Sequence, residues 1–534
     1  MTRMLLALVY CTGVLSHILL FKRSEWDRHS PKLILTYISF NIFTFFAFFS
    51  TSNHSVSNCL FETFLIDCGL TGGIFSSMIA YRFILHPLVA FPGPFAAQIS
   101  SAWAFREQWP NLKLYMKLRD LHDQYGDFVR IRPRELSIRC ADAVNDIHGP
   151  RNRIRKGEFY DQIHPAHSLQ FNRDYNKHKH QRRFWDKAFQ PRALQEYTPR
   201  VIKHYKSLMG IFTEDATVDA PIDVTRLLMD LFFDVISDLT LGESFRSLET
   251  RQRNPVVREF LARQKIVGFA LLNMWVLHLL RSIRSPRKHT WYANALSKRK
   301  QMKNISPDLY TYLSQSETFE VDGIHEAQLA IIAGADTNAI TVSNICYLLC
   351  QHPDYQQQLF EEISNLPVHE DVVDDHLLID RPCLSSIINE TLRLYPPVPG
   401  GLQRLTPPEG AIIAGRYIPG NIVVSTPTFA LQRDPRSFVR PDEFVPERWT
   451  SQPDLIVRRD AFVPFSYSAY SCAGKPLAMM QLRMVVAMII RKFELSFAPD
   501  QQEVYQRYLQ DQADCFTLHL HPLPLILKKR VSKG

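Results

Sequence analysis

Three long apolar segments near the N-terminus constrain the fold of this chain more than any other feature. Residues 4–21 and 33–50 contain no Asp, Glu, Lys or Arg, and residues 69–85 contain only one charge, Arg82. Each segment is close to the ~20 residues that a helix needs to cross a bilayer. We therefore expect residues 1–90 to form a membrane anchor with up to three transmembrane helices.

Charge differs between the two loops that join these segments. Residues 22–32 carry four Lys or Arg side chains against two acidic ones, whereas residues 51–59 carry no charge. Because positively charged loops stay in the cytoplasm, we expect the first loop to face the cytosol, and with three spans the remaining chain as well. Asn53, which begins an Asn-x-Ser sequon, is then a predicted lumenal glycosylation site. The alternative is one anchor over residues 69–85, with the earlier segments lying in the membrane interface.

Residues 91–534 are predicted to form one mainly α-helical body with a minor β component. A proline-rich hinge precedes it, since prolines at 87, 92 and 94 prevent helix continuation. The net charge of +9 is modest for 534 residues and favours a membrane surface or an acidic protein partner over nucleic acid. Nine cysteines without a CxxC pair favour a reducing compartment. Strands are expected at residues 128–131, 136–139, 410–413 and 421–425.

Cys472 lies in a loop, residues 464–476, that precedes an apolar helix predicted over residues 477–490. Unpaired N–H groups at a helix N-terminus favour a thiolate. Small residues on both sides would let a flat cofactor approach the backbone, as an axial thiolate ligand of haem iron requires. Taken alone, a single cysteine is more often a small core residue.

A second candidate lies in the apolar helical run predicted over residues 323–351, which contains Gly334, Asp336 and Thr337. A helix interior disfavours glycine, and buried Asp and Thr need partners. One interpretation is a close helix crossing with satisfied polar groups. The other is a helix opened locally beside a reactive centre, where Gly334 leaves space for a small ligand and the two polar residues relay protons.

Two charged clusters complete the pattern. Glu390 and Arg393 share a helix face, and Arg448 could join them in a buried ion network in which every member is needed. His178 and Arg182 are four residues apart, which suits the binding of a carboxylate such as a haem propionate. A solvated basic face is the alternative for this second cluster.

Together and in this order, these clusters closely resemble those of the cytochrome P-450 superfamily. The resemblance covers the chain after the anchor, and residues 156–161 and 399–404 look like those of fungal membrane-bound members of secondary metabolism. It implies the cytochrome P-450 fold and haem b, with Cys472 as the axial ligand of the iron. It also implies proton delivery by Asp336 and Thr337, and propionate contacts from His178, Arg182, Arg404 and Tyr470.

The cysteine loop departs from the family pattern Phe-x-x-Gly-x-Arg-x-Cys-x-Gly, which begins here at Phe465. Ser468 occupies the Gly position and Tyr470 the Arg position. Because Gly supplies a positive φ, Ser468 is expected to cost about 1 kcal/mol unless the turn is reshaped. Tyr470 offers a neutral hydroxyl to a propionate in place of a charged group.

By resemblance, the protein inserts one oxygen atom of O2 into a lipophilic secondary metabolite of terpenoid, polyketide or indole type. Electrons are expected from NADPH through NADPH–cytochrome P-450 reductase, at the endoplasmic reticulum membrane. Lys187, Lys475 and Arg483 are candidates for the basic docking face. Substrate contacts are expected from residues 159–169, 267–276, 329–333, 398–402 and 515–517.

Two other functions compete with this prediction. One is a haem-thiolate isomerase or dehydratase that needs no external electrons, and the other is a non-catalytic haem-binding protein. The intact pair Asp336-Thr337 favours the monooxygenase over the first. Only the changes at Ser468 and Tyr470 favour the second.

Overall fold

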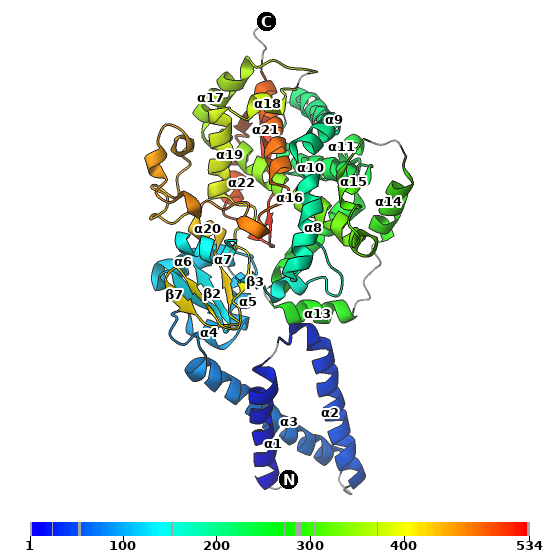
Figure 1. The fold of residues 1–534 in the computed structure, drawn as a ribbon, viewed down its shortest axis with the longest axis vertical. Helices are drawn as coiled ribbons and strands as arrows, with labels where there is room; N and C mark the ends of the chain where they lie inside the picture. Colours follow the sequence, from blue (N-terminus) through cyan, green and yellow to red (C-terminus); the bar gives the residue numbers. More distant parts are fainter. Residues whose placement is uncertain are drawn as a thin grey trace.

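Three apolar helices project from one end of a helical body (Figure 1). The computed structural model describes residues 3–23, 25–51, 55–150, 153–218, 220–271, 273–283, 290–303, 306–370 and 372–530. Asn53, the predicted glycosylation site, lies outside these residues. The anchor helices are α1 (Arg3–Ser16, continued by a π-helical turn His17–Phe21), α2 (Ser30–Thr51) and α3 (Val56–Ala80, continued by Tyr81–Leu85).

The third anchor helix is longer than the sequence pattern indicates. It begins at Val56 rather than near residue 69, and it includes Glu62 and Asp67. Helices α1 and α3 pack closely, because a Cβ on Gly13 would lie 2.2 Å from the carbonyl oxygen of Leu70. Backbones approach this closely only where a side chain is absent.

Four helices in the described part of the chain are long and apolar enough to cross a bilayer, and three of them form the anchor. The fourth is α16 (Phe319–Gln351), whose apolar window is 72% buried inside the protein. A helix that is apolar on all sides and covered by protein is a core helix. Helix α16 therefore belongs to the body, as predicted for residues 323–351.

The body is mainly helical, as expected. Its central contact joins α16 to α10 (Val224–Leu241), and α19 (Pro382–Leu394) and α21 (Lys475–Lys492) pack on α16. The largest apolar core cluster includes residues from all four. The other helices are α4 (Phe95–Ile99), α5 (Ala102–Gln108), α6 (Leu114–Tyr125), α7 (Ala141–His148), α8 (Tyr175–Ala188), α9 (Pro191–Asp215), α11 (Ser247–Thr250), α12 (Pro255–Leu271), α13 (Met274–Ile283), α14 (Thr290–Gln301), α15 (Leu309–Leu313), α17 (Pro353–Ser364), α18 (Asp375–Leu378), α20 (Thr428–Leu431) and α22 (Gln502–Tyr508).

The main sheet lies between the anchor and the helical part (Figure 1). It has the order β1-β2-β8-β5-β3, formed by Phe128–Arg132, Glu135–Ile138, Val423–Ser425, Arg404–Leu405 and Arg155–Lys156. Strands β2 and β8 are parallel, while β5 pairs with β8 and with β3 in antiparallel register. The smaller sheets contain β4 (Ile222–Asp223), β12 (Pro524–Lys529) and β9 (Phe493–Phe497); β6 (Ala411–Ile413) and β7 (Arg416–Ile418); and β10 (Ala513–Asp514) and β11 (Leu518–His519).

All four predicted strands are present within two residues of their expected bounds. The predicted helix at 477–490 is α21, and the segment from His178 to Phe189 lies on α8 and its C-cap. These elements bring the main sheet, α8 and the cysteine loop to one region of the body.

Candidate functional site

Cys472 follows a short 3-10 helix, Ser468–Tyr470, and precedes α21 by three residues. Its backbone N–H donates to the carbonyl oxygen of Phe465 at 2.8 Å, which closes the loop. The backbone N–H groups of Gly474 and Lys475 point toward the sulfur and favour the thiolate, as does the charge of Arg182. Cys472 is an exposed residue, yet desolvation by the protein packed around its sulfur has the larger effect and raises the pKa of the thiol above its ordinary value.

The loop keeps the backbone that the glycine pattern requires, although a serine occupies the position. Ser468 has φ = 59°, in the left-handed region that non-glycine residues rarely adopt. Ser466, two residues earlier, has φ = 58°. The turn is therefore not reshaped around Ser468, and the loop carries the strain that the sequence predicts.

Helix α8 holds the cysteine loop through Arg182. Its Nη1 donates to the carbonyl oxygen of Ser471 at 2.7 Å, one residue before the cysteine. Its Nε donates to Asp186 at 2.6 Å on the same helix. Arg182 thus fixes the loop backbone, a contact that the sequence pattern did not predict.

A buried cationic cluster lies beside this loop. The ring of Tyr470 lies 4.7 Å from the ring of His178, 4.8 Å from the guanidinium of Arg404 and 5.0 Å from Nζ of Lys156. His178, Arg404 and Lys156 are all buried. Burial, together with the neighbouring positive charges, lowers the pKa of His178 to about 3 and lowers that of Lys156 well below its usual range.

The strand register makes this cluster unfavourable without an anion. Lys156 on β3 pairs with Arg404 on β5, and like charges directly opposite each other are destabilising. Burial raises the pKa of the neighbouring Glu326 to about 8, so this carboxyl does not neutralise the pair at pH 7. An anionic group bound between Lys156 and Arg404 would stabilise the charged form of the lysine.

Two buried polar atoms in the cluster show where such an anion fits. Tyr470 Oη and Arg404 Nε have no hydrogen-bond partner among the described residues. The Nη1 of Arg404 already donates to Tyr160 Oη at 2.8 Å, and Nζ of Lys156 donates to the carbonyl oxygens of Leu169 and Gln170. Unpaired donors beside a cysteine loop fit the propionates of a haem whose iron is bound by Cys472.

Helix α16 is not opened at residues 333–337. It is continuous from Phe319 to Gln351, and the Thr337 hydroxyl donates to the Ala333 carbonyl oxygen at 3.0 Å within it. Gly334 does not leave space for a ligand either, because a Cβ there would lie 2.8 Å from Cγ1 of Ile236 on α10. The close helix crossing is therefore the correct interpretation of Gly334, and the local opening is wrong.

Asp336 is fully surrounded by protein and has two neutral partners. Its Oδ2 accepts hydrogen bonds from Thr517 Oγ1 at 2.5 Å and Gln264 Nε2 at 3.1 Å. Oδ1 has no partner among the described residues. Burial raises the pKa of Asp336 to about 7, within the range in which a side chain exchanges protons at neutral pH.

The predicted ion network is present. Glu390 accepts from Arg393 Nη2 at 2.8 Å and from Arg448 Nε at 2.9 Å, and all three side chains are inaccessible to solvent. Arg393 also donates to three backbone carbonyls and Arg448 to three others. Full pairing of this kind is the condition under which buried charges persist.

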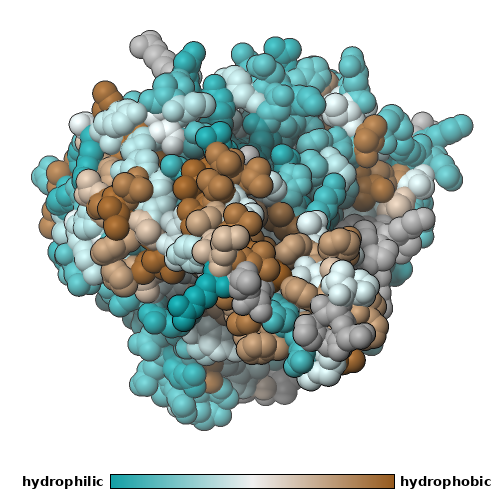
Figure 2. Space-filling view, turned by 90° about the horizontal axis from the view of Figure 1, so that it is seen from below, coloured by the Kyte–Doolittle hydropathy of each residue, from teal (hydrophilic) through white to brown (hydrophobic). Residues whose placement is uncertain are grey.

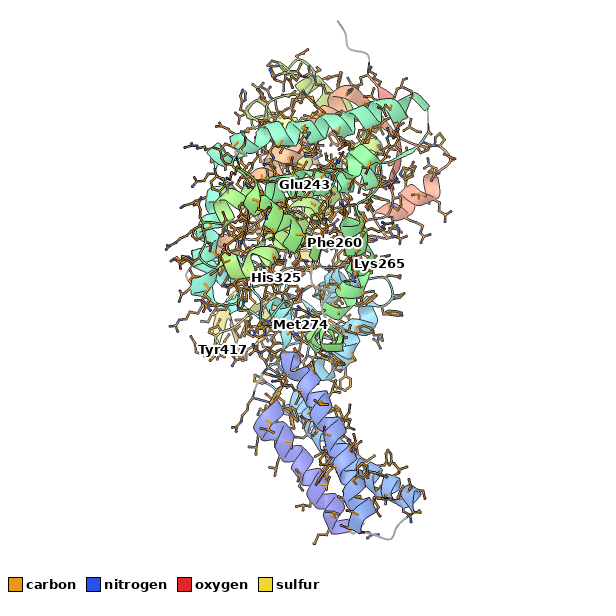
Figure 3. All side chains as sticks on the ribbon, turned by 90° about the vertical axis from the view of Figure 1, so that its right-hand side faces the viewer. Glu243, Phe260, Lys265, Met274, His325 and Tyr417 are labelled. Atoms are coloured by element: carbon orange, nitrogen blue, oxygen red, sulfur yellow. The ribbon has the colours of Figure 1, made fainter. Side chains whose placement is uncertain are left out.

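Three of the segments expected to contact substrate form one apolar cluster. Phe159 stacks on Phe516 with ring centroids 5.3 Å apart, and Leu271 and Met274 pack with them. Met274 lies at the base of the body, directly above the anchor (Figure 3). Thr517, next to Phe516, binds Asp336, so this cluster adjoins the buried carboxyl.

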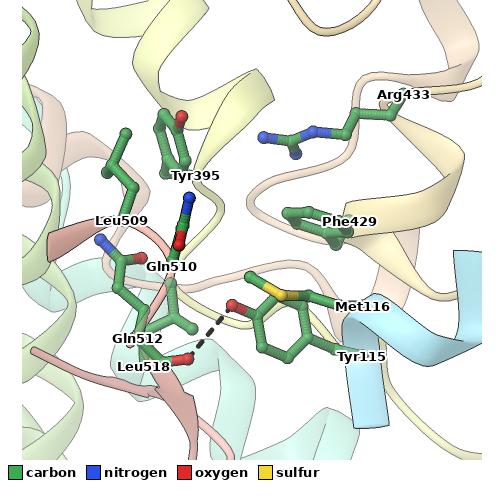
Figure 4. A pocket seen from close by; sticks show the side chains of 9 residues that line it. All are labelled: Tyr115, Met116, Tyr395, Phe429, Arg433, Leu509, Gln510, Gln512 and Leu518. Atoms are coloured by element: carbon green, nitrogen blue, oxygen red, sulfur yellow. Dashed lines mark hydrogen bonds between the residues drawn. The ribbon is translucent and has the colours of Figure 1, made fainter. Parts of the chain in front are cut away.

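A cavity of about 180 Å³ lies elsewhere, between α6, α20 and the segment 509–518. In it Arg433 lies over the ring of Phe429, and Tyr115 Oη donates to the Gln512 carbonyl oxygen (Figure 4). None of the predicted site residues lines this cavity.

Comparison with known proteins decides the family. The cytochrome P450 family model matches residues 97–512, which is most of the chain. The chain is a cytochrome P450. It is therefore a haem-dependent monooxygenase by family, and the family's haem-thiolate cofactor agrees with the donors found around Cys472.

Fungal relatives match this P450 over most of their length. It is 34% identical to cytochrome P450 monooxygenase nodW of Hypoxylon pulicicidum over 99% of both chains. It is 31% identical to phqL of Penicillium fellutanum over 99% of this chain and 96% of the relative. Tryprostatin B 6-hydroxylase of Aspergillus fumigatus is 34% identical over 86% of this chain and 84% of its own.

Sequence reasoning missed Lys156 and Gln264 as members of the site. It placed Tyr160 and Thr517 in segments expected to contact substrate, but not as partners of Arg404 and Asp336. Lys156 had a signal, since it opens a segment that resembles the fungal members. Nothing local in the sequence links Gln264 or Thr517 to Asp336, because these contacts join residues that are 72 and 181 positions apart.

Proposed function

We propose that this cytochrome P450 binds haem b and hydroxylates or epoxidises a lipophilic secondary metabolite. The observation that carries the cofactor assignment is the buried cluster of Lys156, Arg404 and His178 beside the Cys472 loop, where Arg404 Nε and Tyr470 Oη have no hydrogen-bond partner among the described residues. These two unpaired groups can donate hydrogen bonds to the propionate carboxylates of a haem, and they lie beside the loop that carries the Cys472 thiol. Haem supplies the activation of O2 when it is bound.

The protein's own residues supply positioning and protons. Cys472 is held by the bond from its N–H to Phe465, and Arg182 fixes the carbonyl that precedes it. Asp336 carries its proton on Oδ1 below pH 7, since Oδ2 already accepts two hydrogen bonds. From there the proton can pass toward the hydroxyl of Thr337, the next residue on α16.

NADPH–cytochrome P450 reductase is the proposed electron donor. Lys187 and Lys475 are exposed near the cysteine loop and can contact an acidic protein. Arg483 cannot serve as expected, because it forms a two-bond ion pair with Asp375 at 2.7 and 2.8 Å. The docking face is thus proposed around α8 and the start of α21 without Arg483.

The anchor is proposed to cross the endoplasmic reticulum membrane three times, with the body in the cytosol. Apolar side chains gather across the face seen from the anchor end (Figure 2). Exposed Phe95, Trp109, Ile266 and Trp275 extend the apolar surface of the anchor onto α4, α12, α13 and the end of α5. An entrance at this face would admit substrate from the bilayer.

The substrate is proposed to be lipophilic because the cluster around Phe159 and Phe516 is apolar. The relative named tryprostatin B 6-hydroxylase supports hydroxylation as the reaction.

Spectroscopy tests the proposal directly. The reduced, CO-treated protein should show the absorption band of thiolate-ligated haem, and Cys472→Ser should lose it. Cys383→Ser, which changes another free cysteine, should keep the band. NADPH consumption with reductase should then depend on added lipophilic compounds. A wild-type protein without the band would refute the cofactor assignment, and a normal band without NADPH use would favour an isomerase.

A further inference from the structure

The loop between the first two anchor helices is bound to the catalytic body. Glu25 in this loop accepts two hydrogen bonds from the Arg173 guanidinium, from Nη1 at 2.9 Å and from Nη2 at 3.1 Å. Both side chains are only about a quarter exposed, at 25% and 24%. Arg173 lowers the pKa of Glu25 in spite of partial burial, so the carboxylate is ionised at neutral pH. Bidentate hydrogen bonds between a guanidinium and a carboxylate are stronger than hydrogen bonds between neutral groups.

Arg173 connects this loop to the walls of the site. Its Nη1 also donates to Asp161 Oδ2 at 2.6 Å, at the end of the turn Glu158–Asp161 that carries Phe159 and Tyr160. Its Nε donates to the backbone carbonyl oxygen of Lys156 at 3.3 Å. One guanidinium therefore joins the anchor loop, the apolar cluster and the strand that places Lys156 beside Tyr470.

A second contact lies at the start of α2. The Ser30 hydroxyl donates to the Trp275 carbonyl oxygen on α13 at 2.9 Å, 245 residues away in sequence. The turn Asp27–His29 packs against the same helix. Helix α13 contributes Met274 to the apolar cluster (Figure 3). Two independent contacts thus hold residues 25–30 against segments that line the site.

The contacts require the loop and the body to lie on one side of the membrane. A chain that crosses three times puts its first inter-helix loop and its body on the same side. The contact between Glu25 and Arg173 is consistent with that number of spans. It also means that the anchor does more than attach the body to a membrane.

We propose that residues 25–30 are a positioning element of the catalytic body, in which Glu25 acts through Arg173 to fix residues 156–173. This inference goes beyond the proposed oxidation and does not depend on it. Without the Glu25 carboxylate, one side of the Arg173 guanidinium contacts solvent. Residues 156–173, which lie between the anchor loop and the cofactor cluster, then become more mobile. The reacting groups themselves are not altered.

Hydrogen exchange of the full-length haem protein in phosphatidylcholine nanodiscs tests this. Glu25→Ala should make backbone amides in residues 157–173 exchange about tenfold faster, because the contact that restrains them is lost. Glu249→Ala is the matched control, since Glu249 also binds one guanidinium, that of Arg246, through two hydrogen bonds on a remote surface. It should leave residues 157–173 at the wild-type rate.

A double variant separates the proposed link from general damage. Arg173→Met should raise exchange in the same residues, and adding Glu25→Ala to it should change nothing further. Additive effects would overturn the link through Arg173. Exchange in residues 157–173 that stays at the wild-type rate in Glu25→Ala would overturn the positioning role. Neither readout requires turnover, so an inactive enzyme leaves the test intact.

Discussion

Lys156 and Arg404 lie directly opposite each other on antiparallel strands, and both place their charge against the ring of Tyr470. The family pattern has an arginine at position 470, where this chain has a neutral tyrosine. A buried lysine, Lys156, places its amino group 5.0 Å from the ring of that tyrosine.

Lys156→Met should therefore weaken cofactor retention. Removing one of the cations that face the propionates should speed haem transfer to excess apomyoglobin by about tenfold, equivalent to about 1.4 kcal/mol. Lys156→Arg should retain most of the affinity because it keeps the charge. Lys179→Met, on the exposed face of α8, is the control and should transfer haem at the wild-type rate. An unchanged rate in Lys156→Met would show that this lysine supports only the Leu169 and Gln170 carbonyls.

Ser468→Gly should stabilise the protein. Ser468 has φ = 59°, and glycine adopts this conformation without the penalty of a Cβ, which is about 1 kcal/mol. Ser471, three residues later, has φ = −62°, so Ser471→Gly should instead destabilise by about 0.5–1 kcal/mol through the unfolded state. Denaturant unfolding of the two variants should give opposite signs. Equal signs would mean that strain at Ser468 is absorbed elsewhere in the loop.

The pH dependence of protein stability should reveal the titration of the Asp336 carboxyl group. Its pKa is about 7 in the folded protein and about 3.9 in the unfolded chain. Between these values the folded state holds a proton that the unfolded state releases, so stability falls as pH rises from 4 to 7 and then levels off. The full effect is up to about 4 kcal/mol.

Asp336→Asn removes this titration and can still accept from Gln264 and Thr517. Its melting temperature should rise relative to that of the wild type as pH increases from 5 to 8. Glu326, whose pKa is also raised, contributes equally to both proteins and cancels in the difference. A difference in melting temperature that stays constant across this range would contradict the assignment.

Much of this site could be predicted from local sequence, and the reasons for the remainder are physical. Cys472 is marked by the motif of a single loop, and Glu390 and Arg393 lie within one helix turn, while Arg448 belongs to a second short motif 58 residues further along the chain. Gly334 was ambiguous because a glycine can admit either a ligand or a neighbouring side chain. Only the path of α10, which brings Ile236 to it, decides between them. The position of Lys156 opposite Arg404 follows from the pairing of β3 with β5, and no local sequence pattern specifies this register.

Breaking the buried ion network should strongly lower the free energy of unfolding. Glu390→Gln removes the carboxylate that pairs with both Arg393 and Arg448, and removal of a partner from a buried pair costs about 3–5 kcal/mol. Glu443→Gln, which breaks the exposed pair with Arg440, should cost less than about 1 kcal/mol. Unfolding of both variants in denaturant measures the contrast. Similar small losses in the two proteins would mean that the backbone carbonyls around Arg393 and Arg448 suffice to hold them.

Thr337→Ala tests proton delivery separately from folding. The Thr337 hydroxyl donates to Ala333 within α16, and its loss leaves an unbroken helix because the backbone bonds remain. The variant should consume NADPH with reductase at a rate within about threefold of wild type but divert most of it to hydrogen peroxide, since proton transfer typically contributes 10²–10⁴-fold. Thr337→Ser keeps the hydroxyl and should keep the wild-type peroxide yield. If Thr337→Ala released no more peroxide than Thr337→Ser, the hydroxyl would have no part in moving the proton from Asp336.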